Sequence, residues 1–137
     1  MAKSVLVDTG PIVAYLHRGD IWHDAATRFF KSWRGEIVTT WAVITEAMYL
    51  SDSRAARLAV LHWIQRGLSV PVQDTNDVAV MERYLRKYAD RAPDFADLSL
   101  LALAERSGIR DIVTIDTTDF EIYRLSNGRV LNNLLVE

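Results

Sequence analysis

The sequence predicts an α/β fold, in which a central, mainly parallel sheet of about four to five strands lies between layers of helices. Two observations lead to this prediction. Short apolar runs of strand length alternate along the chain with longer segments of helical periodicity. The segments between successive strands are long enough to form helical crossovers, and such crossovers join parallel strands. We therefore expect a three-layer α/β/α architecture.

The composition is that of an ordinary globular protein and favours one domain over residues 1–137. Half of the 137 residues are hydrophobic and a quarter are charged. The chain has no cysteine, which excludes disulfides, thiolate metal sites and a thiol nucleophile. Asp8 interrupts the first apolar run, so a signal peptide is not expected, and the apolar runs are too short to span a bilayer. We expect a cytoplasmic protein with no membrane partner.

The first strand is predicted at residues 4–7, with the sequence SVLV. Pro11 suits the first turn of a helix, because its missing N–H is not needed there, and this helix should end near His17. Asp20 is predicted to cap a second helix, in which alanine and aromatic residues recur at helical spacing. Gly35 should end that helix.

The middle of the chain continues the alternation of strands and helices. A second strand is predicted at residues 36–40 and a helix at residues 41–51. Another helix is expected over residues 53–65, followed by a third strand at residues 68–72. Pro71 places this third strand at a sheet edge or makes it end there, because proline cannot donate to a ladder.

Two more helices follow, each with a capping signal. Asp74 or Thr75 is predicted to cap a helix that reaches about Ala89. Asp94 is predicted to cap the next helix, which is rich in small and apolar residues and should end at Gly108. Both helices are long enough to cross from one strand to the next.

A fourth strand is predicted at residues 111–115, with short strands expected at residues 122–125 and 129–131. In open parallel sheets, ligands bind beyond the carboxyl ends of the strands. Asp8 follows the first strand and Asp116 follows the fourth. These two acids therefore lie where such a fold places its chemistry.

Further acids occupy comparable places, although each one has an ordinary explanation. Glu46 lies in the helix after the second strand, and Asp94 and Asp97 begin an otherwise apolar helix, three residues apart on one face. An aspartate after a strand is often a turn former, and an acid in the first turn of a helix complements the helix dipole. Taken singly, none of these residues indicates a function.

Taken together, the acids indicate a cation site. An unpaired charge among apolar helix residues, such as Glu46 or Asp97, costs several kcal/mol, and clustered carboxylates raise one another's pKa values. Divalent cations relieve both effects, and ligand sets made only of oxygen favour Mg²⁺ or Mn²⁺ over zinc. A carboxylate cluster that holds one or two such ions can activate water for attack on a phosphodiester.

Four ordered blocks of sequence carry a resemblance to a known family. The blocks are VDTG at residues 7–10, T-x5-E at 40–46, DFADLSLLALAE at 94–105 and TIDTTDF at 114–120. This series resembles PIN-domain ribonucleases, and most closely the VapC-type toxins of prokaryotic toxin–antitoxin pairs. The resemblance implies a PIN-like domain whose catalytic and metal-binding residues are Asp8, Glu46, Asp97 and Asp116. Asp119 matches a position that helps to hold metal, and the role of Asp94 stays open.

The resemblance also implies an activity and partners. It implies Mg²⁺-dependent or Mn²⁺-dependent cleavage of single-stranded RNA, inhibition by a cognate antitoxin, and a homodimer. Thr9 and Thr114 match small polar residues that orient the acids by hydrogen bonds. Two alternatives remain: a PIN-like module that binds RNA or protein without cutting, and a PIN nuclease outside any toxin–antitoxin pair. The presence of all four expected acids favours an enzyme.

The basic residues give a weaker signal. The net charge of −2 provides no global argument for nucleic-acid binding. Lysines and arginines crowd residues 54–91, where they are candidates for phosphate contact, but charge alone favours the simpler explanation of a solvated helix face. The chain contains no Walker motif, no G-x-G-x-x-G and no G-x-S-x-G, so the corresponding enzyme classes lack support.

Overall fold

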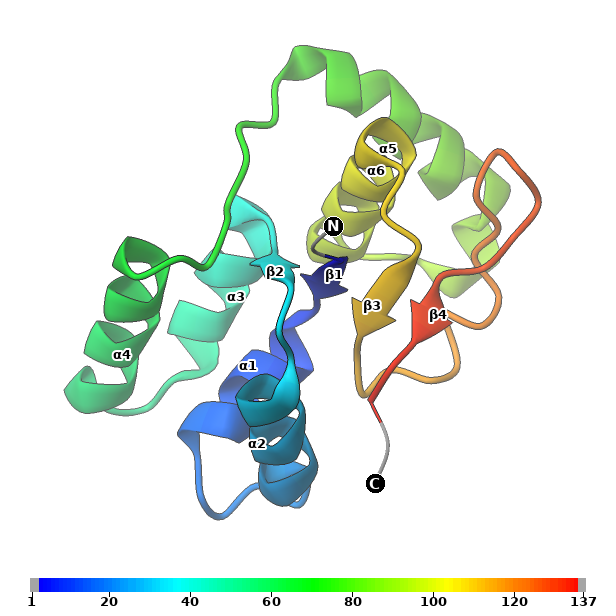
Figure 1. The fold of residues 1–137 in the computed structure, drawn as a ribbon. Coiled ribbons are helices and arrows are strands. Elements are labelled where there is room, and N and C mark those ends of the chain that lie inside the picture. The colour runs from blue at the N-terminus through cyan, green and yellow to red at the C-terminus, as the bar shows by residue number, and fades with distance from the viewer. Residues whose placement is uncertain (1–2, 136–137) are drawn as a thin grey trace.

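A computed structural model describes residues 3–135 and contains a four-stranded sheet in which all pairs are parallel (Figure 1). The strands are β1 (Ser4–Val7), β2 (Glu36–Val38), β3 (Asp111–Val113) and β4 (Asn132–Asn133), in the spatial order β2-β1-β3-β4. Leu6 pairs with Val38 on one side and with Ile112 on the other, so β1 is central. The predicted α/β fold with a mainly parallel sheet is confirmed.

An irregular segment without a helix joins β3 to β4, and helices form the connections from β1 to β2 and from β2 to β3 (Figure 1). They are α1 (Thr9–Leu16), α2 (His23–Ser32), α3 (Trp41–Leu50), α4 (Arg54–Gln65), α5 (Thr75–Lys87), the 3₁₀ turn η1 (Ala89–Arg91) and α6 (Phe95–Ser107). Helix α1 packs against α2 and α3, and α6 packs against α3 and α5. No helix within residues 3–135 is long and apolar enough to cross a membrane.

The capping signals in the sequence explain most of the helix ends. The Ser53 and Asp94 side chains accept hydrogen bonds from the backbone N–H groups of Ala56 and Asp97, and so begin α4 and α6. Asp74 and Asp77 form a reciprocal capping box at the start of α5. Gly108 ends α6 with a φ of 77°, in the left-handed region that favours glycine.

Pro11 lies in the first turn of α1, as predicted, and Asp8 occupies the N-cap position of this helix. One helix begins at a residue other than the predicted one. Helix α2 begins at His23, and its N-cap residue Trp22 makes no side-chain cap. The prediction that Asp20 caps α2 was therefore wrong: the Asp20 carboxylate accepts from the backbone N–H of Trp22 at 2.8 Å, within the preceding turn.

The strands were predicted less well than the helices. Residues 68–72 form no strand, and only Ser69 bridges to Val38, because Pro71 has no N–H with which to extend the pairing. No strand forms at residues 122–125 or 129–131 either. The short final strand is β4, which pairs with β3.

The core lies around the central strand and the small-residue helix. The side chains of Val5, Leu6 and Val7 are fully buried. Helix α6 is buried at nearly every position from Ala96 to Ala104, which explains why its residues are apolar all round rather than along one stripe. This burial anchors the start of α6 close to the carboxyl ends of β1 and β3, where the predicted acids lie.

Candidate active site

Seven carboxylates line one cavity of about 470 Å³ beyond the carboxyl ends of β1 and β3. They are those of Asp8, Asp20, Glu46, Asp94, Asp97, Asp116 and Asp119. No lysine or arginine occurs among the residues within 3–135 that line it. We call this cavity the acidic pocket. All five acids predicted to bind metal, Asp119 included, therefore face one space, although they come from segments far apart in the sequence.

Asp8 is the most deeply buried of these acids, at 8 % exposure. Its carboxylate accepts two hydrogen bonds of 2.8 Å, from the backbone N–H of Thr9 and from the hydroxyl of Thr114. Burial raises the pKa of Asp8 to about 6, although these hydrogen bonds lower it and the charges of Glu46 and Asp116 raise it. The β1 strand thus presents a fixed carboxylate whose negative charge is only partly compensated.

Thr114 connects the two acids that follow β1 and β3. Its hydroxyl donates to Asp8 and accepts from the backbone N–H of Asp116 at 2.9 Å. Its own backbone is held by Asn133 of β4, whose side chain accepts from the Thr114 N–H at 3.2 Å and donates to the Thr114 carbonyl at 3.0 Å. The Asn133 side chain therefore extends the sheet pairing by one residue, to the edge of the acidic pocket.

Asp97, Asp116 and Asp119 form the tightest group in the acidic pocket. One carboxylate oxygen from each lies within 4.8 Å of the other two. The Asp116 carboxylate also accepts from the backbone N–H of Asp119 at 3.0 Å, and Arg91 lies 3.6 Å from the Asp119 carboxylate. Burial and the charge of Asp116 raise the pKa of Asp119, while Arg91 lowers it.

Among these three acids, Asp97 has the carboxyl group whose pKa is raised furthest above its ordinary value. Its backbone N–H is held by the N-cap Asp94, which fixes the first turn of α6 beside the pocket. Burial raises the pKa of Asp97 to about 8, and neighbouring carboxylates, Asp94 first and Asp8 next, raise it in the same direction. At neutral pH this carboxyl group holds a proton in the protein alone, because ionising it would add one more negative charge to the pocket.

The donor set fits a hard divalent cation. Oxygen ligands bind at about 2.0 to 2.1 Å from Mg²⁺ and about 2.3 to 2.6 Å from Ca²⁺, so two ligands of one ion lie up to roughly 4 to 5 Å apart. Asp97, Asp116 and Asp119 each place one carboxylate oxygen within 4.8 Å of the other two, which is close to this range. Asp8 and Glu46 face the same pocket from β1 and α3 but lie outside this tight group. A cation would also relieve the repulsion that raises the pKa values of Asp8 and Asp97.

The structure identifies two site residues that the sequence interpretation missed, and it gives Thr9 a different role from the expected one. Asp20 lines the acidic pocket, whereas the sequence marked it only as a helix cap. Asn133 supports Thr114 from the end of the described chain, and no local sequence signal identifies it. The Thr114 hydroxyl orients two acids as expected, but the buried Thr9 hydroxyl has no hydrogen-bond partner among residues 3–135, so only the Thr9 backbone contacts Asp8.

Comparison with known proteins gives the same architecture. The family model described as the PIN domain matches residues 5–127. Ribonuclease VapC26 of Mycobacterium tuberculosis is 27 % identical over 128 residues, which cover 90 % of this chain and 95 % of that protein.

Two solved structures share the fold. The crystal structure of M. tuberculosis VapC20, described as a sarcin-ricin loop cleaving toxin, aligns with a TM-score of 0.76 and 20 % identity. That alignment covers 83 % of this chain and 91 % of VapC20. VapBC2 from Rickettsia felis, solved on a DNA fragment from its promoter, aligns with a TM-score of 0.63 and 12 % identity, covering 86 % and 91 % of the two chains.

Proposed function

Because the chain belongs to the PIN-domain family, we propose that it is a metal-dependent endoribonuclease that cleaves single-stranded RNA. The observation that carries this proposal is the acidic pocket, where three carboxylate oxygens lie within 4.8 Å of one another and four further acids face the same space. The similarity to a protein named as a ribonuclease supports RNA as the substrate.

Asp97, Asp116 and Asp119 would hold the cation, with Asp8 and Glu46 available to complete its ligands from β1 and α3. We propose Mg²⁺ or Mn²⁺, since every donor is a hard oxygen atom. When bound, such an ion stabilises the charge that develops on phosphate oxygens and makes water more acidic.

The side chains of the protein supply position and charge. Thr114 holds Asp8 and the backbone of Asp116 in fixed relation, and Asp94 fixes the first turn of α6 that carries Asp97. Arg91 holds Asp119 from the outside of the pocket. No lysine or arginine among the described residues lines the acidic pocket, so the pocket repels the RNA backbone until the negative charge of the carboxylates is neutralised.

Cleavage of a labelled single-stranded RNA by the full chain tests the proposal. Activity should require Mg²⁺ or Mn²⁺ and stop with a chelator, and Asp97→Asn or Asp116→Asn should lower kcat/KM by at least about 100-fold, because even supporting groups around a metal contribute about 10-fold to 100-fold. Asp24→Asn is the matched control, since Asp24 is an exposed acid on α2.

Two outcomes would contradict the proposal. Cleavage that persists in chelator, or that survives both pocket substitutions, would reject this mechanism. Failure to cleave any RNA, with a cation still raising the melting temperature, would favour a PIN-like module that binds without cutting.

We further propose that the chain is the toxin of a type II toxin–antitoxin pair. We also propose that residues 1–137 form one cytoplasmic domain and that this domain forms a homodimer. The relatives described as a toxin and as a VapBC complex support an antitoxin partner. The sheet brings Asp8 of the first strand to within hydrogen-bond distance of Thr114, which supports a single domain over this length.

A further inference from the structure

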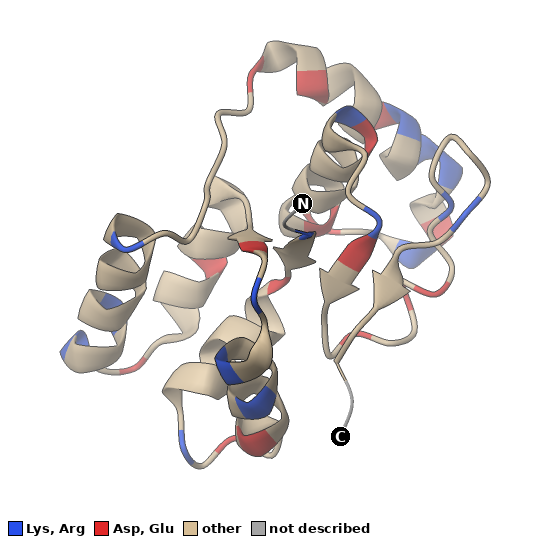
Figure 2. Ribbon diagram, viewed as in Figure 1, with Lys and Arg blue, Asp and Glu red and all other residues tan. Residues whose placement is uncertain are grey.

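A second charged cavity, of about 430 Å³, lies between the C-terminal half of α5 and the loop that follows Tyr123. Its lining contains three cationic side chains, those of Arg83, Lys87 and Arg124, and no carboxylate among the described residues. Figure 2 shows lysines and arginines gathered on this part of α5 and on the loop beside it. We call this cavity the basic pocket. None of the residues predicted to bind metal lines it.

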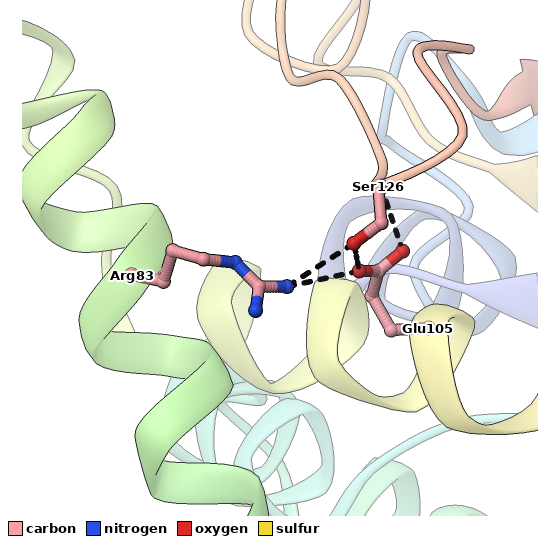
Figure 3. A network of polar contacts seen from close by, with 3 residues as sticks. All are labelled: Arg83, Glu105 and Ser126. Atoms are coloured by element: carbon pink, nitrogen blue, oxygen red, sulfur yellow. Dashed lines mark hydrogen bonds and ion pairs between the residues drawn. The ribbon is translucent and has the colours of Figure 1, made fainter.

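Arg83 is held in a fixed position across the basic pocket. Its Nη2 atom donates to Glu105 Oε2 at 3.0 Å and to Ser126 Oγ at 3.3 Å (Figure 3). Glu105 also accepts from the backbone N–H of Ser126 at 3.0 Å, so one carboxylate of α6 joins the helix wall to the loop wall. The basic pocket is therefore a built cavity, whose two walls are joined, rather than a row of free surface side chains.

The other two cations face the basic pocket without acidic partners. Among residues 3–135, neither Lys87 nor Arg124 makes an ion pair, whereas the nearby Arg86 and Arg91 pair with Glu82 and Asp119. Lys87 Nζ lies 5.3 Å above the ring of Tyr88, which orients the amine without neutralising it. Two uncompensated positive charges on one cavity favour a bound anion.

Cations that border the two pockets lie close together in the sequence. Arg83 and Lys87 are four residues apart on α5, which places them about 6 Å apart along the helix axis and on one face. Arg91 follows four residues later in the 3₁₀ turn η1, and its guanidinium pairs with Asp119 of the acidic pocket. Residues 83–91 therefore supply two cations to the basic pocket and one that contacts an acid of the acidic pocket.

We propose that the basic pocket binds a backbone phosphate of the RNA substrate, at a distance from the phosphodiester that is cleaved. This inference rests on the proposed function, since it takes RNA as the ligand. Phosphate contacts position a nucleic acid without reading its bases. Lys87 and Arg124 would thus contribute to the affinity for any single strand, while the acidic pocket performs the chemistry.

Binding of a fluorescein-labelled 20-nucleotide RNA, measured by anisotropy in chelator over a series of salt concentrations, tests the proposal. Lys87→Ala/Arg124→Ala should weaken binding about 10-fold, equally for oligo(U) and oligo(A), because phosphate contacts carry no sequence information. The slope of log K against log salt should become shallower by about 0.7, because the double variant loses one phosphate contact and each neutralised phosphate of a single strand contributes about 0.7. In cleavage assays KM should rise by the same factor while kcat is retained.

Arg28→Ala/Arg54→Ala is the matched control, because it removes the same charge from exposed positions on α2 and α4 that line neither pocket. An equal loss of affinity in the control would show a general charge effect and overturn the site. Unchanged RNA binding by the Lys87→Ala/Arg124→Ala variant would also overturn it. If this variant binds RNA normally but no longer binds a protein partner, the basic pocket is part of the interface with that protein. The binding result stands even if the wild type cleaves no RNA, so the two proposals fail separately.

Discussion

Thr114 shows how a single hydroxyl can organise charged groups from distant parts of a chain. It donates to Asp8, 106 positions away in the sequence, and accepts from the backbone of Asp116. A hydroxyl can do both at once because it carries one donor and two lone pairs. The hydrogen bond to Asp8 favours the ionised carboxylate, which partly opposes the effect of burial. Thr114 thus fixes the position of both acids and favours the ionised form of Asp8.

Removing the support beneath Thr114 should impair catalysis more than stability. Asn133→Ala eliminates the three hydrogen bonds that the side chain makes to Thr114 N, Thr114 O and Leu135 N. We expect kcat to fall about 10-fold with little change in KM, because groups that orient metal ligands typically contribute 10-fold to 100-fold.

Steady-state kinetics and a melting curve on the same preparation measure this effect. Asn132→Ala is the control, because the exposed side chain of Asn132 hydrogen-bonds only to Asp111 among the described residues. If Asn133→Ala cleaves RNA at the wild-type rate, Asn133 does not position the site.

At the scale of elements, the positions of the helices could be predicted from the sequence more reliably than the pairing of the short strands. The cap Asp94 was identified correctly because a cap depends on atoms within three residues of it. The strand predicted at residues 68–72 failed because a strand needs a partner, and only Ser69 meets one. Strand β4 has two residues and follows an irregular loop, so its pairing with β3 leaves no periodic trace in the sequence.

The residues of the candidate site also differ in whether the sequence could predict them. Asp8, Glu46, Asp97 and Asp116 could be predicted to lie together because, although each has an ordinary local explanation, the four of them match a family pattern. Asp20 could not, because its place in the acidic pocket depends on the loop between α1 and α2, where an aspartate also satisfies a local turn, and it belongs to none of the matching blocks. Sequence alone therefore yields the acids that belong to a recognisable set and misses the acid that stands outside it.

Gly10 controls how closely α1 approaches the segment after β3. A Cβ at this position would lie 2.4 Å from Ile115 Cγ1 and 2.6 Å from Ile115 Cδ1. We therefore expect Gly10→Ala to lower the free energy of unfolding by about 1 to 3 kcal/mol, the usual cost of overpacking, and to displace Asp8 and Asp116 relative to each other.

Chemical denaturation measures the loss, and a double-mutant cycle identifies its source. Ile115→Ala removes both atoms that would clash, so Gly10→Ala should cost less in that background. Equal costs in the two backgrounds would show that the contact with Ile115 is not the cause.

At the scale of the whole molecule, the acidic pocket makes stability depend on pH. In the folded protein, burial raises the pKa of Asp8 to about 6 and that of Asp97 to about 8, from values near 3.8. Between about pH 4 and pH 8 the folded state therefore retains protons that the unfolded chain has released. Raising the pH across this interval favours unfolding, and the effect levels off above pH 8.

The Asp97→Asn variant isolates this effect. In chelator at pH 8 the free energy of unfolding of the variant should exceed that of the wild type by about 2 kcal/mol. This is well below the value that the whole pKa shift of Asp97 would give, because Asp97 is partly exposed to solvent. The difference should shrink toward pH 4, and Mn²⁺ should stabilise the wild type far more than the variant. Urea denaturation at both pH values, with Asp24→Asn as the control, measures it. A wild type that becomes more stable between pH 4 and pH 8 in chelator would contradict this reasoning.

The order in which the chain is synthesised gives the hydrogen bond between Asp8 and Thr114 a further meaning. A ribosome-bound chain that ends within α6 already carries Asp8, Glu46 and Asp97, but it lacks Thr114, Asp116 and the Asn133 that supports them. Such a nascent fragment holds acids without the arrangement that lets them work together. The translating ribosome, which itself contains RNA, therefore meets the assembled pocket only after β3 and β4 have emerged and folded against β1.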